Sequence, residues 1–330
     1  MDTVRRTKEL CKFSTKWILR HLDVKPSTYY NWLRSSNKDK ITINRHPDKI
    51  LSEERRAVIS YALRNPNIRH RELTWRMVDE NVAFLSATSV YKILKEEGLI
   101  CSWQPKEKRK KRTRELPSSP DYGWQSDISY IEVDGRKYYI ITFVDEHSRY
   151  VTHHEVMTSM DGNSVSLAAE RAISKLDREK TPIIQTDNGS AYISHEFKMV
   201  LSQNGVGHHR IHPYCPEENG LVERVNKTVK EKIDDYELRN IAHARAIIDE
   251  IIRYYNEERL HSAINFLRPI DYYRGDPEKL LKERCIKIFQ ARHRRREKNL
   301  KIKQHSLALV ELEINQNHNL FQRTKIPLLS

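Results

Sequence analysis

Three acidic residues occupy positions from which their carboxylates could act together on metal ions. Asp127 lies in a stretch of period-two alternation that predicts a strand, and Asp187 follows a short apolar run typical of a buried strand. Glu223 falls in a helix expected to begin after Asn219 and Gly220. Phosphoryl transfer with two metal ions needs carboxylates that converge on cations about 3.5 to 4 Å apart. Because hard cations such as Mg²⁺ and Mn²⁺ prefer oxygen ligands, the three acids are candidate ligands for such a pair.

The segments around these acids resemble a known family, whereas a single acid without that context would be a solvated surface charge. Asp187 and Glu223 are separated by 35 residues. The pattern resembles the catalytic core of retroviral integrases and of the integrase-type (DDE) transposases of bacterial insertion sequences, most closely over residues 121–274. The matching segments are Trp124-Gln125-x-Asp127, Thr186-Asp187-Asn188-Gly189-Ser190 and Asn219-Gly220-x-x-Glu223-x-x-Asn226-Lys227-x-x-Lys230.

This resemblance implies an α/β ribonuclease H-like core in which Asp127, Asp187 and Glu223 are catalytic and bind two Mg²⁺ ions, for which Mn²⁺ can substitute. It also implies that Lys227 and Lys230 contact the DNA end. These lysines follow Glu223 by four and seven positions, so all three side chains share one helix face. The alternative is that both lysines are ordinary surface residues, with Lys227 paired to Glu223.

Composition limits the class of protein. Apolar residues make up 38% and charged residues 32% of the 330 positions. No apolar run is long enough for a membrane span or a signal peptide, so we expect a cytoplasmic, nucleoid-associated bacterial protein without a membrane partner. The four cysteines are far apart, which favours reduced thiols over disulfides or the zinc module of retroviral integrases.

The net charge of +14 is unevenly distributed along the chain. Residues 1–120 carry a surplus of 13 positive charges, residues 121–280 a surplus of 7 negative charges, and residues 281–304 a surplus of 8 positive charges. An acidic centre that needs cations is therefore flanked by basic segments suited to phosphate backbones.

The basic N-terminal part predicts two helical units. In residues 1–36, a helix ending near Asp23 and a second starting at Pro26 outline a helix-turn-helix, and a helical hairpin is an equally good interpretation. After a linker at 37–51, residues 52–104 predict a second helix-turn-helix, and 105–120 form a basic linker. The candidate DNA contacts in these segments are Ser27, Thr28, Asn31, Arg109, Lys110, Lys111 and Arg112.

The catalytic core is expected to span residues 121–276 with the order β-β-β-α-β-α-β-α. A hairpin at Asp134-Gly135 joins the first two strands, and Asp145 is interpreted as a structural residue in a turn. The later segment Tyr255-Asn256-x-x-Arg259-x-His261 resembles one that follows the catalytic helix in insertion-sequence transposases. Residues 277–330 form a basic C-terminal region with a helix over 281–304, and 307–314 could be a strand.

These features predict a transposase that binds element-end and target DNA and catalyses strand cleavage and strand transfer. We expect a homo-oligomer on DNA, and an upstream helix-turn-helix protein is a further possible partner. One alternative is a DNA-binding regulator with an inert integrase-like core, and the presence of all three acids argues against it. The other is a ribonuclease H-like nuclease without strand transfer, which two helix-turn-helix units make a poorer fit.

Overall fold

The computed structural model describes six stretches of the chain: residues 14–22, 24–30, 46–100, 116–177, 179–213 and 215–323. The chain divides into two compact units, Val58–Lys287 and a second that combines residues up to Ala57 with residues from Ile288 onward. Five candidate DNA contacts lie outside the described residues: Asn31, Arg109, Lys110, Lys111 and Arg112.

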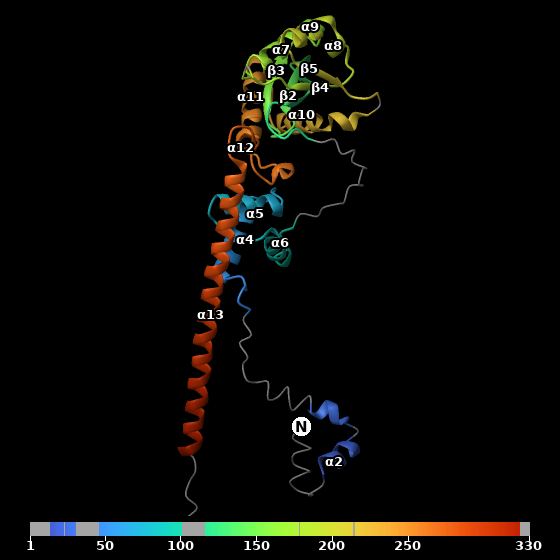
Figure 1. Cartoon of the computed structure of the whole chain (residues 1–330). Coiled ribbons are helices and arrows are strands. Elements are labelled where there is room, and N and C mark those ends of the chain that lie inside the picture. The colour runs from blue at the N-terminus through green and yellow to red at the C-terminus, as the bar shows by residue number, and fades with distance from the viewer. Residues whose placement is uncertain are drawn as a thin grey trace, which may run out of the picture. The chain divides into compact units, whose positions relative to one another are not determined.

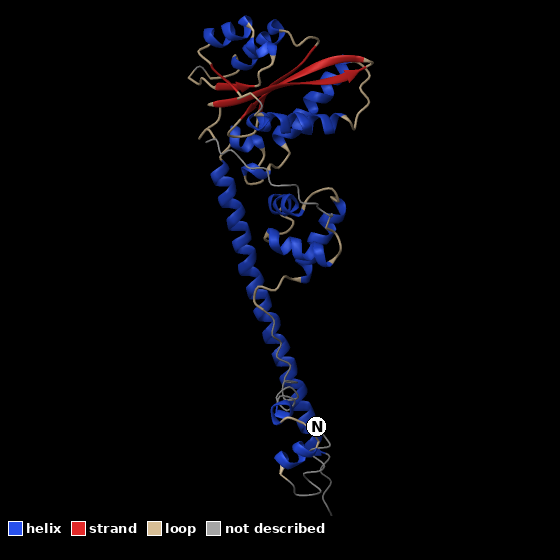
Figure 2. Cartoon of the chain, turned by 90° about the vertical axis from the view of Figure 1, so that its right-hand side faces the viewer, coloured by secondary structure: helices blue, strands red, loops and turns tan. Residues whose placement is uncertain are grey.

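A five-stranded sheet forms the centre of the larger unit, and Figure 2 shows its strands in red. The spatial order is β3-β2-β1-β4-β5; the first three strands of the chain pair antiparallel, whereas β4 and β5 run parallel to β1. The strands are β1 (Gly123–Val133), β2 (Arg136–Asp145), β3 (Val151–Met157), β4 (Ile183–Thr186) and β5 (Gly207–Arg210).

The hairpin between β1 and β2 has the predicted two-residue turn. Asp134 and Gly135 have φ angles of 51° and 69°, and Val133 pairs directly with Arg136. Positive φ at both central positions matches the right-handed twist of the flanking strands. The turn therefore fixes the register that places each β1 side chain on its face of the sheet.

Helices cover both faces of the sheet (Figure 1). On one face, α7 (Gly162–Ile173), α8 (Ser190–Ile193) and α9 (His195–Gln203) bury a cluster that includes Trp124 and Phe143. On the other face, α10 (Gly220–Ile233) and α11 (Ile241–Glu257) pack over β1, β2 and β3. This order of elements is the predicted ribonuclease H-like arrangement, which the structure confirms.

Three helices precede the core: α4 (Ser52–Arg64), α5 (His70–Asp79) and α6 (Ala87–Glu96). The Ser86 hydroxyl accepts a hydrogen bond from the Ser89 backbone N–H, and Gly98 follows α6 with a φ of 68°. These are an N-terminal cap and a glycine stop of the usual kind. In the other unit, α2 (Thr15–His21) is capped by Ser14, and helical backbone resumes at residues 26–30.

The C-terminal part is one helix, α13 (Pro277–Arg323), preceded by the short α12 (Pro269–Tyr273). The expectation of a strand at 307–314 is wrong, because these residues continue α13. Leu, Ala and Glu dominate that stretch and are strong helix formers. The helix over 281–304 is confirmed but is part of this longer element.

Four basic residues of α13 pair with acids near the start of α4 in the same compact unit. Arg292 and Arg296 bind Asp48 at 3.0 and 2.8 Å. The other two pairs are Arg295 with Glu54 at 2.7 Å and Lys298 with Glu53 at 2.6 Å. These four side chains therefore serve the fold, although a charge count alone would assign them to DNA.

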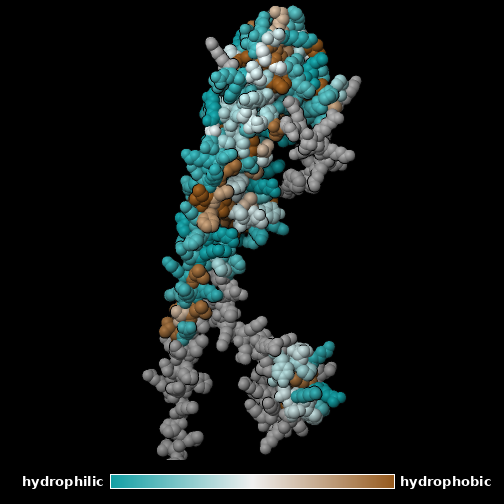
Figure 3. All heavy atoms as spheres, in the orientation of Figure 1, coloured by the Kyte–Doolittle hydropathy of each residue, from teal (hydrophilic) through white to brown (hydrophobic). Residues whose placement is uncertain are grey.

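Among the described helices, none has an apolar stretch sufficient to cross a bilayer. The face of the molecule shown in Figure 3 is mostly hydrophilic, and its apolar residues occur in small patches.

Candidate active site

Asp127 lies on β1 where the sheet opens. β1 pairs with β4 only from Gly123 to Gln125, although it pairs with β2 along its whole length. Beyond Gln125 the edge of β1 is therefore released from β4, and helix α10 packs against β1 instead. The half-buried Asp127 is at this opening.

Asp187 comes next to Asp127 because of the parallel register of β1 and β4. Gln125 pairs with Gln185, and each acid follows its glutamine by two positions. The Asp187 Oδ1 accepts a hydrogen bond of 2.9 Å from the Gly189 N–H. A Cβ atom at position 189 would lie 3.0 Å from that same oxygen, so glycine allows this close approach.

Glu223 is carried by the first turn of α10, which two glutamines fasten to the sheet. The Gln125 and Gln185 amides both donate to the Glu218 carbonyl, at 3.2 and 2.7 Å. Gln125 Oε1 accepts from the Val222 N–H at 3.3 Å. The first N–H groups of a helix have no intrahelical partner, and here the Gln125 side chain accepts from one of them, while both glutamines hold Glu218 just before the helix.

Asn226 connects the catalytic helix directly to Asp127. Its Nδ2 donates to Asp127 Oδ2 at 2.9 Å, and its Oδ1 accepts from the Thr142 hydroxyl at 2.8 Å. Thr142 is the β2 residue that pairs with Asp127. Sequence reasoning gave Asn226 no role of its own, although its position three residues after Glu223 places both on one helix face.

The charges of the three acids influence one another. Burial raises the pKa of Asp127, the hydrogen bond from Asn226 opposes that rise, and the negative charge of Asp187 adds to it. Burial also raises the pKa of Glu223, and the charges of Asp127 and Asp187 raise it further. Neighbouring carboxylates with raised pKa values lack compensating positive charge, as is common at functional sites.

This donor set fits a hard divalent cation in its chemistry. All three side chains offer carboxylate oxygens, and Glu223 is exposed, so its side chain has room to turn. With the side chains as they stand, the described residues contain no group of three or more His, Cys, Asp or Glu close enough together to hold an ion. The three acids are thus close enough for their charges to interact, but their side chains must move closer together to bind the same metal ion.

The two predicted lysine contacts lie on the same helix as Glu223. Lys230 Nζ lies 4.6 Å from the centre of the exposed Tyr130 ring, and its positive charge slightly opposes the pKa rise of Asp127 that burial causes. Lys227 pairs at 3.7 Å with Glu231, not with Glu223, and both partners are exposed. Both ammonium groups therefore remain at the surface beside the acids.

The remaining sequence candidates lie elsewhere. Ser27 is exposed and Thr28 half-buried in the helical residues 26–30 of the smaller unit. Asp145 is fully buried and accepts hydrogen bonds from the Asp121 and Ser148 N–H groups at 2.8 and 2.7 Å. The structural interpretation of Asp145 is thus confirmed.

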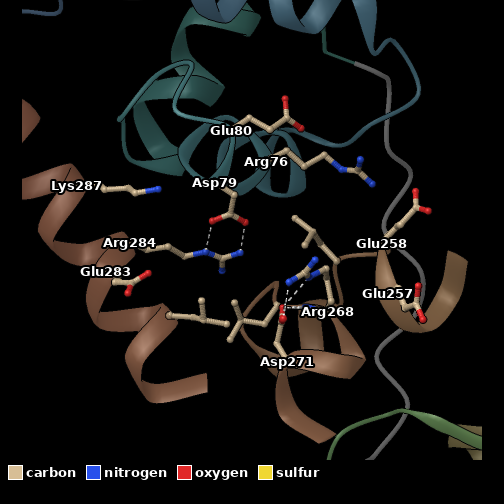
Figure 4. A pocket seen from close by; sticks show the side chains of 13 residues that line it. Arg76, Asp79, Glu80, Glu257, Glu258, Arg268, Asp271, Glu283, Arg284 and Lys287 are labelled. Atoms are coloured by element: carbon tan, nitrogen blue, oxygen red, sulfur yellow. Dashed lines mark hydrogen bonds and ion pairs between the residues drawn. The ribbon is translucent and has the colours of Figure 1, made fainter. Parts of the chain in front are cut away.

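The cavity of about 460 Å³ shown in Figure 4 is away from the three acids. Its walls belong to α5, α12, α13 and the end of α11. The buried Arg284 donates to Asp79 at 2.8 Å, and Arg268 donates to Asp271 at 2.9 Å. The pair of Arg284 and Asp79 joins α13 to α5, whereas the pair of Arg268 and Asp271 caps α12, and none of the lining residues belongs to the acidic cluster.

Comparison with a solved structure gives a similarity in the same region. The HTLV-2 integrase catalytic core domain in complex with magnesium aligns with a TM-score of 0.40 and 23% identity. The alignment covers 48% of this chain and 99% of that one.

Sequence comparisons find similar domains and proteins. Residues 117–216 and 204–269 each match a family described as integrase core domain. A protein (InsK) of insertion sequence element IS150 from Escherichia coli (strain K12) is 24% identical over 268 residues, 77% of this chain and 92% of that protein. The transposase for insertion sequence element IS904 from Lactococcus lactis is 28% identical over 157 residues, 47% of this chain and 62% of that protein. Residues 117–269 of this chain are therefore similar to integrase core domains, and the relatives that this chain matches include proteins of bacterial insertion sequences.

Proposed function

We propose that this protein is a DDE-type polynucleotidyl transferase that cleaves DNA at the ends of an insertion sequence and joins those ends to target DNA. The observation that carries the proposal is the set of Asp127, Asp187 and Glu223, which lie beside one another on β1, after β4 and on α10. Their mutual influence on pKa and their place in an integrase core domain support it.

Asp127, Asp187 and Glu223 would hold two Mg²⁺ ions, for which Mn²⁺ can substitute. When bound, the cations supply Lewis-acid activation of the attacking oxygen and neutralise charge on the leaving oxygen. The protein's own task is to orient the carboxylates. Asn226 fixes one Asp127 oxygen, the Gly189 N–H fixes one Asp187 oxygen, and the glutamines of β1 and β4 seat the helix that carries Glu223.

DNA would lie along α10 and be held by basic residues. Lys227 and Lys230 are exposed or half-exposed on the helix of Glu223 and suit phosphates beside the reacting bond. The N-terminal part, with Ser27, Thr28, Asn31 and the basic linker at 105–120, would bind element ends, and residues 52–104 would act as a second helix-turn-helix. We further propose that copies of the chain assemble on DNA, with or without an upstream helix-turn-helix partner.

The test measures nicking and joining of duplexes that carry the element ends, in Mg²⁺. Asp187→Asn, Asp127→Asn and Glu223→Gln should each lower the rate at least about a hundredfold, since metal ligands are removed. Binding to the same duplex should stay near wild type. Glu132→Gln, an exposed acid on the same strand as Asp127, is the matched control and should keep full activity.

Other outcomes discriminate the alternatives. Wild-type rates from Asp187→Asn would contradict the assignment of the site. A wild-type protein that binds the ends without metal-dependent nicking would instead be a regulator with an inert core. Nicking without joining would identify a ribonuclease H-like nuclease.

A further inference from the structure

Three arginines near the start of α10 form no ion pair with a carboxylate of the described residues. Arg149 lies in the turn between β2 and β3, Arg224 follows Glu223 on α10, and Arg259 follows α11. None of the three side chains makes an ion pair or a hydrogen bond with the described residues. By contrast, Arg268, Arg284 and four basic residues of α13 are paired with acids, so this cluster differs from the arginines that stabilise the fold.

Buried nitrogen atoms in this cluster also lack hydrogen-bond acceptors. They are Arg149 Nε, Arg259 Nη1 and His261 Nδ1, each inaccessible to solvent and without a partner in the described chain. Buried donors are nearly always satisfied in folded proteins, and each exception needs a physical reason. Several such donors in one place point to an anion with several oxygens.

Tyr255 brings these groups together. Its hydroxyl contacts His261 Nε2 at 2.9 Å, and the Arg259 guanidinium lies 5.5 Å from the centre of its ring. Burial raises the pKa of Tyr255 to about 12, so the phenol keeps its proton. With the phenol as donor to Nε2, the ring proton of neutral His261 is on Nδ1, and this is the tautomer in which the buried Nδ1 can bind an anion.

The cluster carries an excess of positive charge. Burial and, after it, the charges of Arg259, Arg149 and Arg224 together lower the pKa of His261 to about 4, so all three guanidinium groups act on one ring. Asp145 and Glu146 also act on Arg149; Asp145 accepts hydrogen bonds from Ser148, and Glu146 Oε1 accepts one from the Gln125 amide. The negative charges of these two acids offset part of the positive charge of the three arginines but do not exceed it.

Arg149 has an unusual backbone conformation that supports a functional role. Its φ is 67°, in the left-handed region that side-chain-bearing residues rarely occupy. The Arg149 N–H closes the turn onto the Asp145 carbonyl at 2.9 Å. Strained positions of this kind occur where a side chain must be held in a particular place.

We propose that Arg149, Arg259 and His261, with Arg224 at the rim, form a site for one phosphate of the DNA backbone. Arginine offers several N–H groups in a planar fork, which suits phosphate oxygens. This inference rests on the proposed function only in taking DNA as the partner. It gives the segment from Tyr255 to His261 a task, which is to bind DNA together with Arg224, the residue that follows Glu223.

The experiment measures binding of the full chain to a short mixed-sequence DNA duplex over a salt series with EDTA present, so that no chemistry occurs. For Arg149→Gln and for Arg259→Gln, affinity should fall on the order of tenfold. The slope of log affinity against log salt should become shallower by about 0.9, the value for one lost phosphate contact. The double variant should show the same loss of slope as either single variant, because both arginines hold one phosphate.

Arg253→Gln is the matched control, since Arg253 lies on α11 and pairs at 3.9 Å with Glu258. It should leave the slope unchanged, and an equal loss would overturn the proposal by indicating a general effect of charge. A twofold larger loss of slope in the double variant would also overturn it. Circular dichroism melts of each variant check the fold, and Arg259→Lys, which keeps the charge, should retain the slope in a folded protein.

Two further arms identify the source of the phosphate. The first arm uses duplexes in which a single phosphate is replaced by an uncharged methylphosphonate. Replacement at one position should weaken binding of the wild-type protein but not of the Arg259→Gln variant, which would support a DNA phosphate as the ligand. In the other arm, inorganic phosphate is titrated against chloride at constant ionic strength. Stabilisation of wild type but not of the variants, with no change in the DNA salt slope, would overturn DNA as the ligand and assign the site to a free anion. Because chemistry is absent, failure of catalysis would not affect these results.

Discussion

At the scale of single residues, hydrogen bonds from neighbouring amides orient the acids. Asp127 accepts from Asn226, which in turn accepts from the Thr142 hydroxyl. This chain joins the first two strands to α10 at the point where Glu223 is carried. Orienting partners of metal ligands commonly affect metal affinity by about 10-fold to 100-fold.

Asn226→Ala should lower the rate of DNA nicking in Mg²⁺ by about 10-fold to 100-fold. The hydrogen bond from Asn226 opposes the rise that burial causes in the pKa of Asp127, so its loss raises that pKa further. A larger fraction of the Asp127 side chains is then protonated at a given pH, so the acidic limb of the pH–rate profile should move to higher pH. Thr228→Ala, on an exposed part of α10, is the control. An unshifted limb would contradict this role for Asn226.

The acids could be predicted from sequence, and their partners could not. Asp127, Asp187 and Glu223 have the residue types and spacing of a metal site. Asn226 and the glutamines are neutral amides whose importance comes from hydrogen bonds to residues more than thirty positions away in the chain. Gln125 and Asn226 stand in the segments that resemble the family, but the sequence does not show which groups they hydrogen-bond.

At the scale of secondary structure, β1 and β4 place the start of α10 through paired glutamines. Gln125 and Gln185 face each other in the parallel register and share the Glu218 carbonyl. Strand register therefore determines where the catalytic helix begins. The sequence predicted these strands and helices well because their apolar periodicity is local, whereas the cross-strand amide pair is visible only in the structure.

Gln125→Met should lower the free energy of unfolding by about 2 kcal/mol, because the buried Val222 N–H loses its acceptor. Urea denaturation measures this loss, and hydrogen exchange of the Val222 amide should become faster. Gln203→Met, at an exposed position of α9, should change stability by less than about 0.5 kcal/mol. Equal effects of the two substitutions would mean that Gln125 does not fasten the helix.

The length of α13 shows where local pattern misled. Apolar alternation at 307–314 suggested a strand, but the helix runs without interruption from Pro277 to Arg323. A few alternating residues are compatible with either structure when the surrounding chain favours a helix.

At the scale of the whole molecule, some basic side chains stabilise the fold through ion pairs, and others are available to bind DNA. The basic stretch at 281–304 looked uniformly suited to DNA, yet Arg292, Arg295, Arg296 and Lys298 are paired with acids of residues 48–54. The arginines near α10 have no such partners. Net charge alone could not separate these two groups, since pairing depends on contacts between distant parts of the sequence.

Acid should destabilise the folded protein. Burial lowers the pKa of a set of described histidines from the ordinary value of 6.5: His70, His153, His154, His208 and His261. Below that value the unfolded chain takes up protons that the folded chain does not, so the free energy of unfolding falls as pH falls. Urea denaturation between neutral pH and about pH 5 measures the effect.

His261 should contribute strongly, because its pKa is about 4. His261→Gln should therefore weaken the pH dependence of stability, whereas His195→Gln, at an exposed position, should leave it unchanged. Stability that is constant over this pH range would contradict the burial of neutral histidines.

The hydrogen bond between Asn226 and Asp127 has a consequence for the order in which the protein is made. Its partners are 99 positions apart. A growing chain that has just completed β4 already contains Asp127, but the helix with Glu223 has not yet been translated. That helix also needs the glutamines of β1 and β4 to seat its first turn. The three acids can therefore be assembled only after the ribosome has passed Ile233, when all five strands of the sheet that receives α10 have been translated.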